Sequence, residues 1–230
     1  NGGDLWNDPL LQTPHYEVPI GSGKNAMYAG SFWIGGMDAG NQILVAAQQY
    51  RQQGANDYWP GPISKDPTSG TISVSNNVCN DFDLLFPITK NEVLSFISGG
   101  PATNNINNWP GNGNVANFQL PYLAPFFDFN NDGQYDPQLG DYPYFNFSGS
   151  YPIDPQTGGF LCENYVFGDK AIWWVFNDIG NIKTETNSGP NGIEVRALAY
   201  AYSSSNSAVN NTTFYKYQII NRSSSTLFHS

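Results

Sequence analysis

The chain has 230 residues, and its 9 Lys plus Arg against 19 Asp plus Glu give a net charge of −10. Such a surface repels nucleic-acid phosphates and anionic lipids, so we expect no nucleic-acid partner, whereas calcium and neutral glycans remain candidates. No run approaches the ~20 apolar residues of a membrane helix, so we also expect no membrane insertion.

Only 12% of the residues are charged, and polarity comes mainly from Asn, Ser, Gly and Thr, which is typical of exported proteins. The start, Asn1–Asp4, lacks the basic and apolar segments of a signal peptide. Ser230 follows closely on a predicted strand. We therefore interpret the chain as a mature product or an interior piece of a longer protein.

In the aromatic, Gly- and Pro-rich first part, residues 28–36 predict a strand. The segment from Ile43 to Gln53 places apolar residues at helical spacing and predicts a helix. The alternative is a strand from Gln42 to Ala46 that runs into a loop.

Thr89 and Glu92 form a capping box, which predicts a short helix to about Ile97, ended by Gly99, Gly100 and Pro101. The Asn-rich stretch 104–117 has no apolar periodicity, so we expect a long surface loop there.

The clearest strands are 171–176, 192–202 and 212–222, with a polar hairpin loop at 203–211. Adjacent Trp173 and Trp174 must point to opposite faces of their strand. The pattern predicts an all-β fold. We expect an antiparallel β-sandwich, jelly-roll or immunoglobulin-like, with long loops and one or two short helices. It would form one domain over residues 1–230, with a possible division into 1–125 and 126–230.

Residues 128–136 place oxygen ligands at every second position, with Gly133 where a calcium loop turns sharply. The usual Glu at position 12 is replaced by Leu139, and the nearest later carboxylate is Asp141. Gln134 would contribute its backbone carbonyl and the others their side chains. The predicted calcium ligands are Asp128, Asn130, Asp132, Gln134, Asp136 and Asp141.

Pro125 and Pro137 argue against helices on either side of this loop, so we expect strands to flank it. The alternative is an Asx-rich turn that binds no metal. Asp81, Asp83 and Asp178 could each help to bind a second cation, but they are more typical of turns.

Cys79 and Cys162 are the only cysteines, and an even pair in an exported protein predicts a disulfide. The alternative is two buried thiols that behave as small apolar residues.

Catalytic candidates are few. His15 and His229 are the only histidines, too few for a nucleophilic triad or a His-based zinc site. A glycosidase needs only two carboxylates, and Glu163 is the best acid for it, although a surface role suits that residue better. We expect a protein that is not an enzyme.

Sugar binding would use exposed aromatic rings. Trp59 and Trp109, each followed by Pro and Gly, are expected on loops and are the first ligand-binding candidates. For any single aromatic residue, core packing is the alternative.

Several phrases of the sequence resemble one group of proteins. They lie at residues 16–19, 32–38, 50–54, 57–62, 123–126, 128–143, 168–178 and 214–223. In this order they are similar to the N-terminal region of large multidomain surface proteins that Bacteroidota export by type IX secretion. The resemblance implies export across the outer membrane, an extracellular or cell-surface location, and calcium binding. It says little about biochemical activity.

Together these features predict a calcium-stabilised structural or adhesive module of a secreted, cell-surface or filament-forming protein. Its partners would be calcium, other copies of the chain or other surface proteins. The alternative is a carbohydrate-binding module of a larger secreted protein, with a glycoside hydrolase as a remote third.

Overall fold

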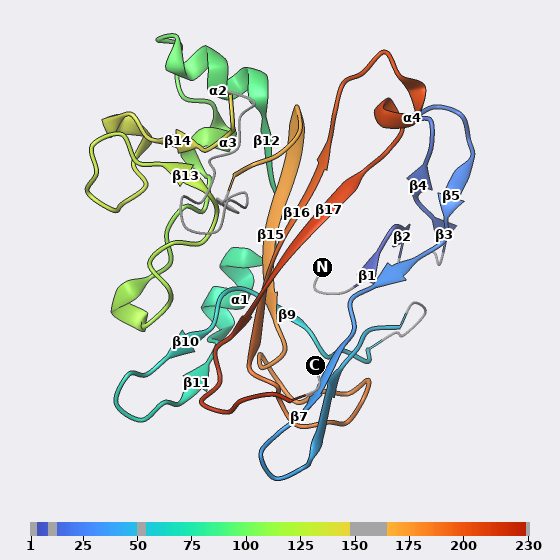
Figure 1. The fold of residues 1–230 in the computed structure, drawn as a ribbon, viewed down its shortest axis with the longest axis vertical. Helices are drawn as coiled ribbons and strands as arrows, with labels where there is room; N and C mark the ends of the chain where they lie inside the picture. The colour runs from blue at the N-terminus through green and yellow to red at the C-terminus, as the bar shows by residue number, and fades with distance from the viewer. Residues whose placement is uncertain (1–3, 9–12, 50–53, 148–164, 229–230) are drawn as a thin grey trace, which may run out of the picture.

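The computed structural model describes residues 4–8, 13–49, 54–147 and 165–228. Its centre is a five-stranded antiparallel sheet (Figure 1). The strand order is β12 (Phe86–Thr89), β15 (Lys170–Asn177), β16 (Ile193–Ala201) and β17 (Phe214–Asn221), and β9 (Trp59–Pro60) pairs with the far end of β15. The expected all-β class is confirmed.

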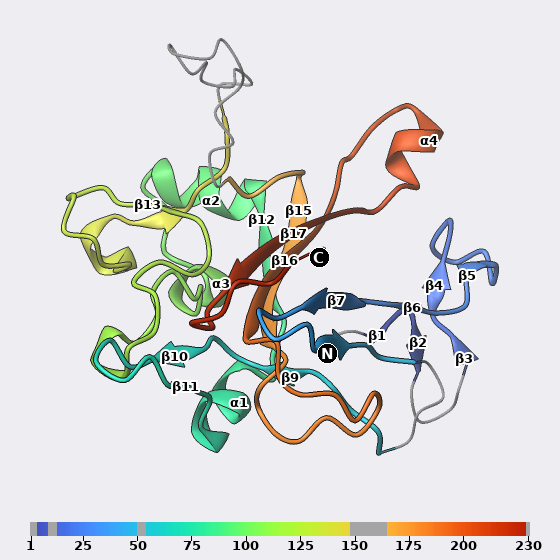
Figure 2. The ribbon, with the colours of Figure 1, turned by 60° about the horizontal axis from the view of Figure 1, so that its bottom comes forward.

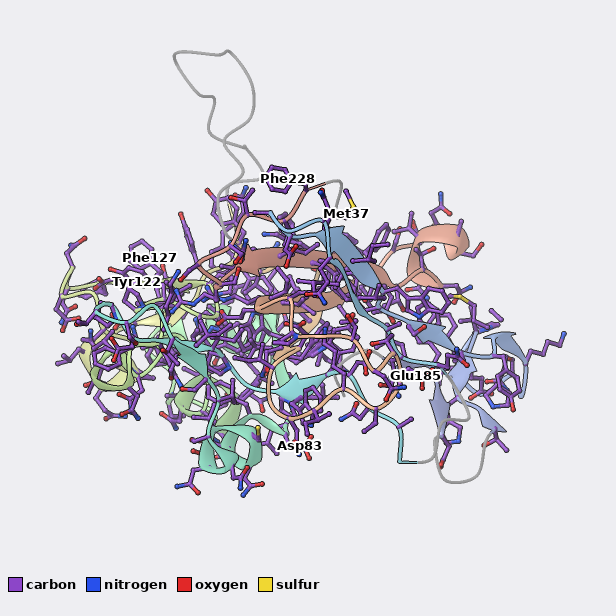
Figure 3. The ribbon with its side chains drawn as sticks, turned by 90° about the horizontal axis from the view of Figure 1, so that it is seen from below. Met37, Asp83, Tyr122, Phe127, Glu185 and Phe228 are labelled. Carbon is purple, nitrogen blue, oxygen red and sulfur yellow. The ribbon has the colours of Figure 1, made fainter. Side chains whose placement is uncertain are left out.

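In the described part of the chain, six two-stranded antiparallel ladders surround this sheet. They are β1 (Asp4–Leu5) with β6 (Gly30–Ser31), β2 (Asn7–Asp8) with β3 (Thr13–Pro14), β4 (Tyr16–Glu17) with β5 (Asn25–Met27), β7 (Ile34–Met37) with β8 (Ile43–Ala46), β10 (Ser64–Lys65) with β11 (Ile72–Ser73), and β13 (Phe126–Phe127) with β14 (Tyr142–Pro143). An isolated bridge between Met37 and Phe228 adds the C-terminal segment to β7 (Figure 3).

The helices are short. They are α1 (Asn76–Phe82), α2 (Lys90–Ile97), α3 (Asn104–Asn107) and α4 (Ser207–Asn210), with 3-10 turns η1 (Val115–Asn117) and η2 (Pro137–Leu139). The predicted capping box is confirmed, because the Thr89 hydroxyl accepts from the Glu92 amide while Glu92 accepts from the Thr89 amide. No helix in the described part of the chain is long and apolar enough to cross a membrane.

Both faces of the central strands β15 and β16 are largely buried, each under its own core. Ala171, Trp173 and Val175 pack on one face with residues from 82–167, while Trp174 and Phe176 pack on the other with residues from 5–58. The two covering layers lie on opposite sides of the sheet in Figure 2. The alternation expected at the Trp173–Trp174 pair is confirmed, and strands from both 1–125 and 126–230 share this one sheet.

Two segments differ from the first expectation for them. Residues 43–46 form strand β8, which was the alternative to a helix, because they pair with β7; residues 50–53 lie outside the described part. The stretch 104–117 is not a plain surface loop, because it contains α3 and buries Ile106 and Trp109 in the core.

Buried charges fasten the loops to the sheet. Lys183 Nζ lies 2.8 Å from Asp178 Oδ2, both side chains being at most 1% exposed, and it also donates to the carbonyls of Val45 and Gly189. Asp178 in turn accepts from the amide of Ile193 at 2.7 Å. A buried charge needs such complete pairing, so this ion pair fixes the 178–190 loop against β8 and β16.

Candidate metal loop

Residues 128–141 close the hairpin of β13 and β14, in the yellow-green lobe of Figure 1. Phe127 and Tyr142 face each other in register and their rings stack with centroids 4.9 Å apart. The expectation that strands flank this loop is confirmed. Because the two ends of the loop are paired, the segment between them starts and finishes at a fixed separation.

The first half of the loop is organised by two carboxylates. Asp128 Oδ1 accepts from the Asp132 amide at 3.2 Å and Oδ2 from the Gly133 amide at 2.7 Å. Asp132 Oδ1 accepts from the Gln134 amide at 2.7 Å, and Asn130 Nδ2 donates to Asp132 Oδ2 at 2.8 Å. Gly133 has φ +76°, a conformation that glycine adopts without strain, so the predicted turn lies at this residue.

The second half is held by Asp141, whose side chain is fully buried. Its Oδ1 accepts from the Phe129 amide at 2.9 Å and its Oδ2 from the Asp136 amide at 2.8 Å, so one carboxylate joins both sides of the loop. Asp136 Oδ1 accepts from the Gln138 amide and caps η2. The hydrogen bonds of the loop account for the turn without a metal.

The structure brings the predicted ligands together only in part. Asp132 is hydrogen-bonded to both Asp128 and Asn130, and Asp136 and Asp141 form a second pair in which the Asp136 amide donates to the Asp141 carboxylate. In the described residues no three carboxylate, imidazole or thiol side chains form a group suited to a metal ion. A calcium shell also takes amide and main-chain oxygens, so it does not require three such side chains.

Asn112 attaches this loop to the rest of the molecule. Its Nδ2 donates to the carbonyls of Gly133 and Pro121, at 3.2 and 3.0 Å, and its Oδ1 accepts from the Tyr135 amide. Tyr135 then reaches the core, where its hydroxyl donates to the Ile106 carbonyl at 2.6 Å and burial raises its pKa. No sequence pattern singles out Asn112, which is one of many asparagines in its segment.

The two tryptophans expected to bind a ligand, Trp59 and Trp109, both pack against other parts of the protein. Trp109 is only 3% exposed, donates from Nε1 to the Pro125 carbonyl and packs on Trp173, so its predicted exposure was wrong. Trp59 is half-buried in β9. A Cβ added to Gly180 would lie only 2.4 Å from the Cβ of Trp59. Trp59 is therefore tightly apposed to the turn after β15.

The remaining candidates have structural environments. Cys79 lies half-buried on α1 and forms no bridge within the described residues, and burial raises its pKa. Cys162 and Glu163 lie outside those residues, so the disulfide stays a prediction. Asp81 lies on α1 and Asp83 at its C-terminal cap. Asp178 pairs with Lys183 and accepts from the amides of Asn191 and Ile193.

Comparison with protein-family models, with curated proteins and with solved structures gave no match to this chain.

Proposed function

We propose that this chain is a calcium-stabilised structural or adhesive module of a secreted, cell-surface or filament-forming protein, without a catalytic role. The observation that carries the proposal is the Asp128–Asp141 loop. It combines alternating side-chain oxygens, a glycine turn and a strand-closed base. Export across the outer membrane, to the cell surface or beyond, belongs to the same proposal.

The calcium site would be built on the first half of the loop. Asp132 is hydrogen-bonded, through its side chain or its amide, to the side chains of Asp128 and Asn130. A carboxylate oxygen that accepts one N–H still has a lone pair free for an ion. Bringing carboxylates together costs repulsion that a divalent ion removes. Extracellular calcium is abundant enough to fill even a site in the millimolar range.

The sheet supplies a route to assembly. Its β12 edge is short, contains Pro87 and has α2 and α3 beside it, features that discourage further strand pairing. At the opposite edge the eight-residue β17 has no strand partner on its outer side in the described part of the chain. Pairing of two β17 edges would extend the sheet across two copies.

The finer fold expectation is part of the proposal. The β7–β8 ladder packs on the face of the sheet that carries Trp174, and the Met37–Phe228 bridge widens it. We interpret this ladder as the beginning of the second sheet of a sandwich.

The test is thermal unfolding in calcium and in excess chelator at fixed pH and ionic strength. We expect calcium to stabilise the protein by ~3–4 kcal/mol at saturation, which is a shift of several degrees. Asp132→Ala should abolish the shift. A matched control is Asp38→Ala, because Asp38 Oδ1 also accepts two main-chain amides in an exposed turn, those of Gly40 and Gln42.

With Asp38→Ala the calcium shift should persist in full. Absence of any shift in the unaltered protein would reduce the loop to an Asx turn and remove the basis of the proposal. A shift that survives Asp132→Ala would place the ion elsewhere.

A further inference from the structure

A polar groove of about 550 Å³ lies beside the β10–β11 hairpin, away from the metal loop. It runs between this hairpin, the start of α1 and the η1 turn. Hydroxyl groups supply most of its polar lining, which includes Ser64, Ser69, Thr71, Ser73 and Ser75. The carboxylate of Asp66 and the aromatic ring of Phe118 also line the groove.

Two of these hydroxyls are available to a ligand. Ser64 and Ser73 are register partners across the β10–β11 ladder, so their side chains project from the same face. Neither hydroxyl has a hydrogen-bond partner among the described residues. Each therefore offers one donor and two acceptor positions to whatever enters the groove.

Phe118 provides an apolar surface in this polar setting. Its side chain is 46% exposed, whereas the other rings of this lobe supply much of the core. The backbone holds it in a left-handed conformation, φ +60°, where its amide donates to Val115 and its carbonyl accepts from the Lys65 amide and Arg222 Nη2. These three hydrogen bonds hold the main chain of Phe118 in place beside the groove that its side chain lines.

The charge around the groove disfavours anions. Asp66 Oδ1 accepts from the amides of Thr68 and Ser69, at 2.7 and 2.9 Å, and these bonds lower its pKa. The nearby cations do not line the groove. Lys65 Nζ donates to the Ser223 carbonyl, and Arg222 donates to the carbonyls of Ile63 and Phe118.

We propose that this groove binds a neutral saccharide. Phe118 would lie under the C–H face of a pyranose ring, while Ser64, Ser73 and the Asp66 carboxylate would bond to its hydroxyls. A ligand rich in hydroxyls with an apolar face matches a site with one exposed ring and unpaired polar groups. The inference goes beyond the calcium-dependent module, because it gives the adhesive role a ligand class and a location distinct from the metal loop.

The experiment uses the full chain on a printed array of neutral, sialylated and sulfated glycans. Titration calorimetry then follows with cellohexaose, xylohexaose, maltohexaose and chitohexaose. We expect binding to a neutral glycan, weakened about tenfold or more by Phe118→Ala and by Ser73→Val, and retained by Phe118→Trp. Trp33→Ala is the control, because Trp33 is 65% exposed but does not line the groove.

Every measurement is repeated in excess chelator, and the melting temperature of each variant confirms that it is folded. The proposal is overturned if no neutral glycan binds, if only sialylated or sulfated glycans bind, or if folded Phe118→Ala and Ser73→Val both bind as the unaltered chain does. None of these outcomes bears on the calcium-dependent shift in melting temperature, so the two proposals fail separately.

Discussion

Trp173 and Trp174 are neighbours in β15, yet their rings are buried in different cores, with exposures of 3% and 5%. One ring packs against Trp109 and Phe86, and the other against Tyr217. β15 is therefore the shared wall of two lobes. A strand whose faces both carry large rings ties the unfolding of the two lobes together, because neither core can open without exposing this strand.

The first prediction compares the indole N–H groups of two buried tryptophans, one in each lobe. Trp109 Nε1 donates to the Pro125 carbonyl at 3.0 Å, whereas the buried Trp174 Nε1 has no partner in the described part of the chain. Replacement by Phe removes a hydrogen bond at Trp109 and an unpaired donor at Trp174. We expect Trp109→Phe to lower the free energy of unfolding by about 1 kcal/mol more than Trp174→Phe does.

Urea denaturation monitored by far-UV circular dichroism measures the two variants under identical conditions. Equal losses, or a greater loss in Trp174→Phe, would mean that the indole donor of Trp174 is satisfied by water or by a partner outside the described residues.

A second prediction separates the buried structural carboxylate of the 128–141 loop from the carboxylate proposed to bind calcium. Asp141 is buried and satisfies the amides of Phe129 and Asp136, so Asp141→Ala should cost ~2–4 kcal/mol in excess chelator. Asp132 is exposed, so Asp132→Ala should cost at most ~0.5 kcal/mol in chelator. The free energies of unfolding come from urea titration with and without calcium.

In calcium, the difference between the costs of Asp141→Ala and Asp132→Ala should become smaller. Asp132→Ala then also loses the stabilisation that the unaltered chain gains from the ion. If Asp132→Ala costs as much in chelator as in calcium, its carboxylate supports the turn and not an ion.

The third prediction concerns the buried ion pair. Lys183→Met leaves the buried Asp178 without its counter-charge, so we expect a loss of ~3–5 kcal/mol in the free energy of unfolding. Lys65→Met is the matched control, since Lys65 Nζ donates to one carbonyl, that of Ser223, without a buried carboxylate beside it. We expect the control to cost about 1 kcal/mol, measured by urea titration at pH 7.

If Lys183→Met and Lys65→Met lose similar amounts of free energy of unfolding, then groups other than Lys183 stabilise the buried charge of Asp178. In that case Asp178→Asn combined with Lys183→Met should be no more stable than Lys183→Met alone. A true pair predicts that the double variant recovers part of the loss.

The features that the sequence predicted are those encoded by neighbouring residues. The Thr89–Glu92 box lies within one helical turn, the alternation around Trp173 within one strand, and the turn at Gly133 within five residues. Their local hydrogen bonds and side-chain period depend little on the rest of the chain.

The features that it did not predict depend on distant partners. Residues 43–46 satisfy both helical and strand patterns, and pairing with β7 decides between them. Trp109 resembles an exposed loop residue until the Pro125 carbonyl and Trp173 surround it. Lys183 and Asp178 bury their charges because β8, the 178–190 loop and β16 meet there. The Phe118 groove likewise combines a hairpin with a turn about fifty residues later in the chain.

The last prediction is a pH dependence at the start of α2. Burial acts to raise the pKa of Glu92, but hydrogen bonds from Thr89, Asn105 and Thr103 outweigh it and hold the pKa below the ordinary value of 4.5. A carboxyl whose pKa is lowered on folding stabilises the protein above its unfolded pKa, and that contribution disappears as the pH falls through the folded value.

Glu92→Gln keeps the capping bond but does not titrate. We therefore expect the unaltered chain to exceed Glu92→Gln in free energy of unfolding by about 0.5–1 kcal/mol at pH 7, discounted for partial exposure. The difference should hold while the pH stays well above 4.5 and should disappear as the pH falls through the lowered pKa of Glu92. Urea titrations of both proteins at pH 7, 5.5, 4 and 3 measure it, and other acid-sensitive groups cancel because the two chains share them. A difference that stays constant across this range would mean that the Glu92 carboxylate is not stabilised by its hydrogen bonds.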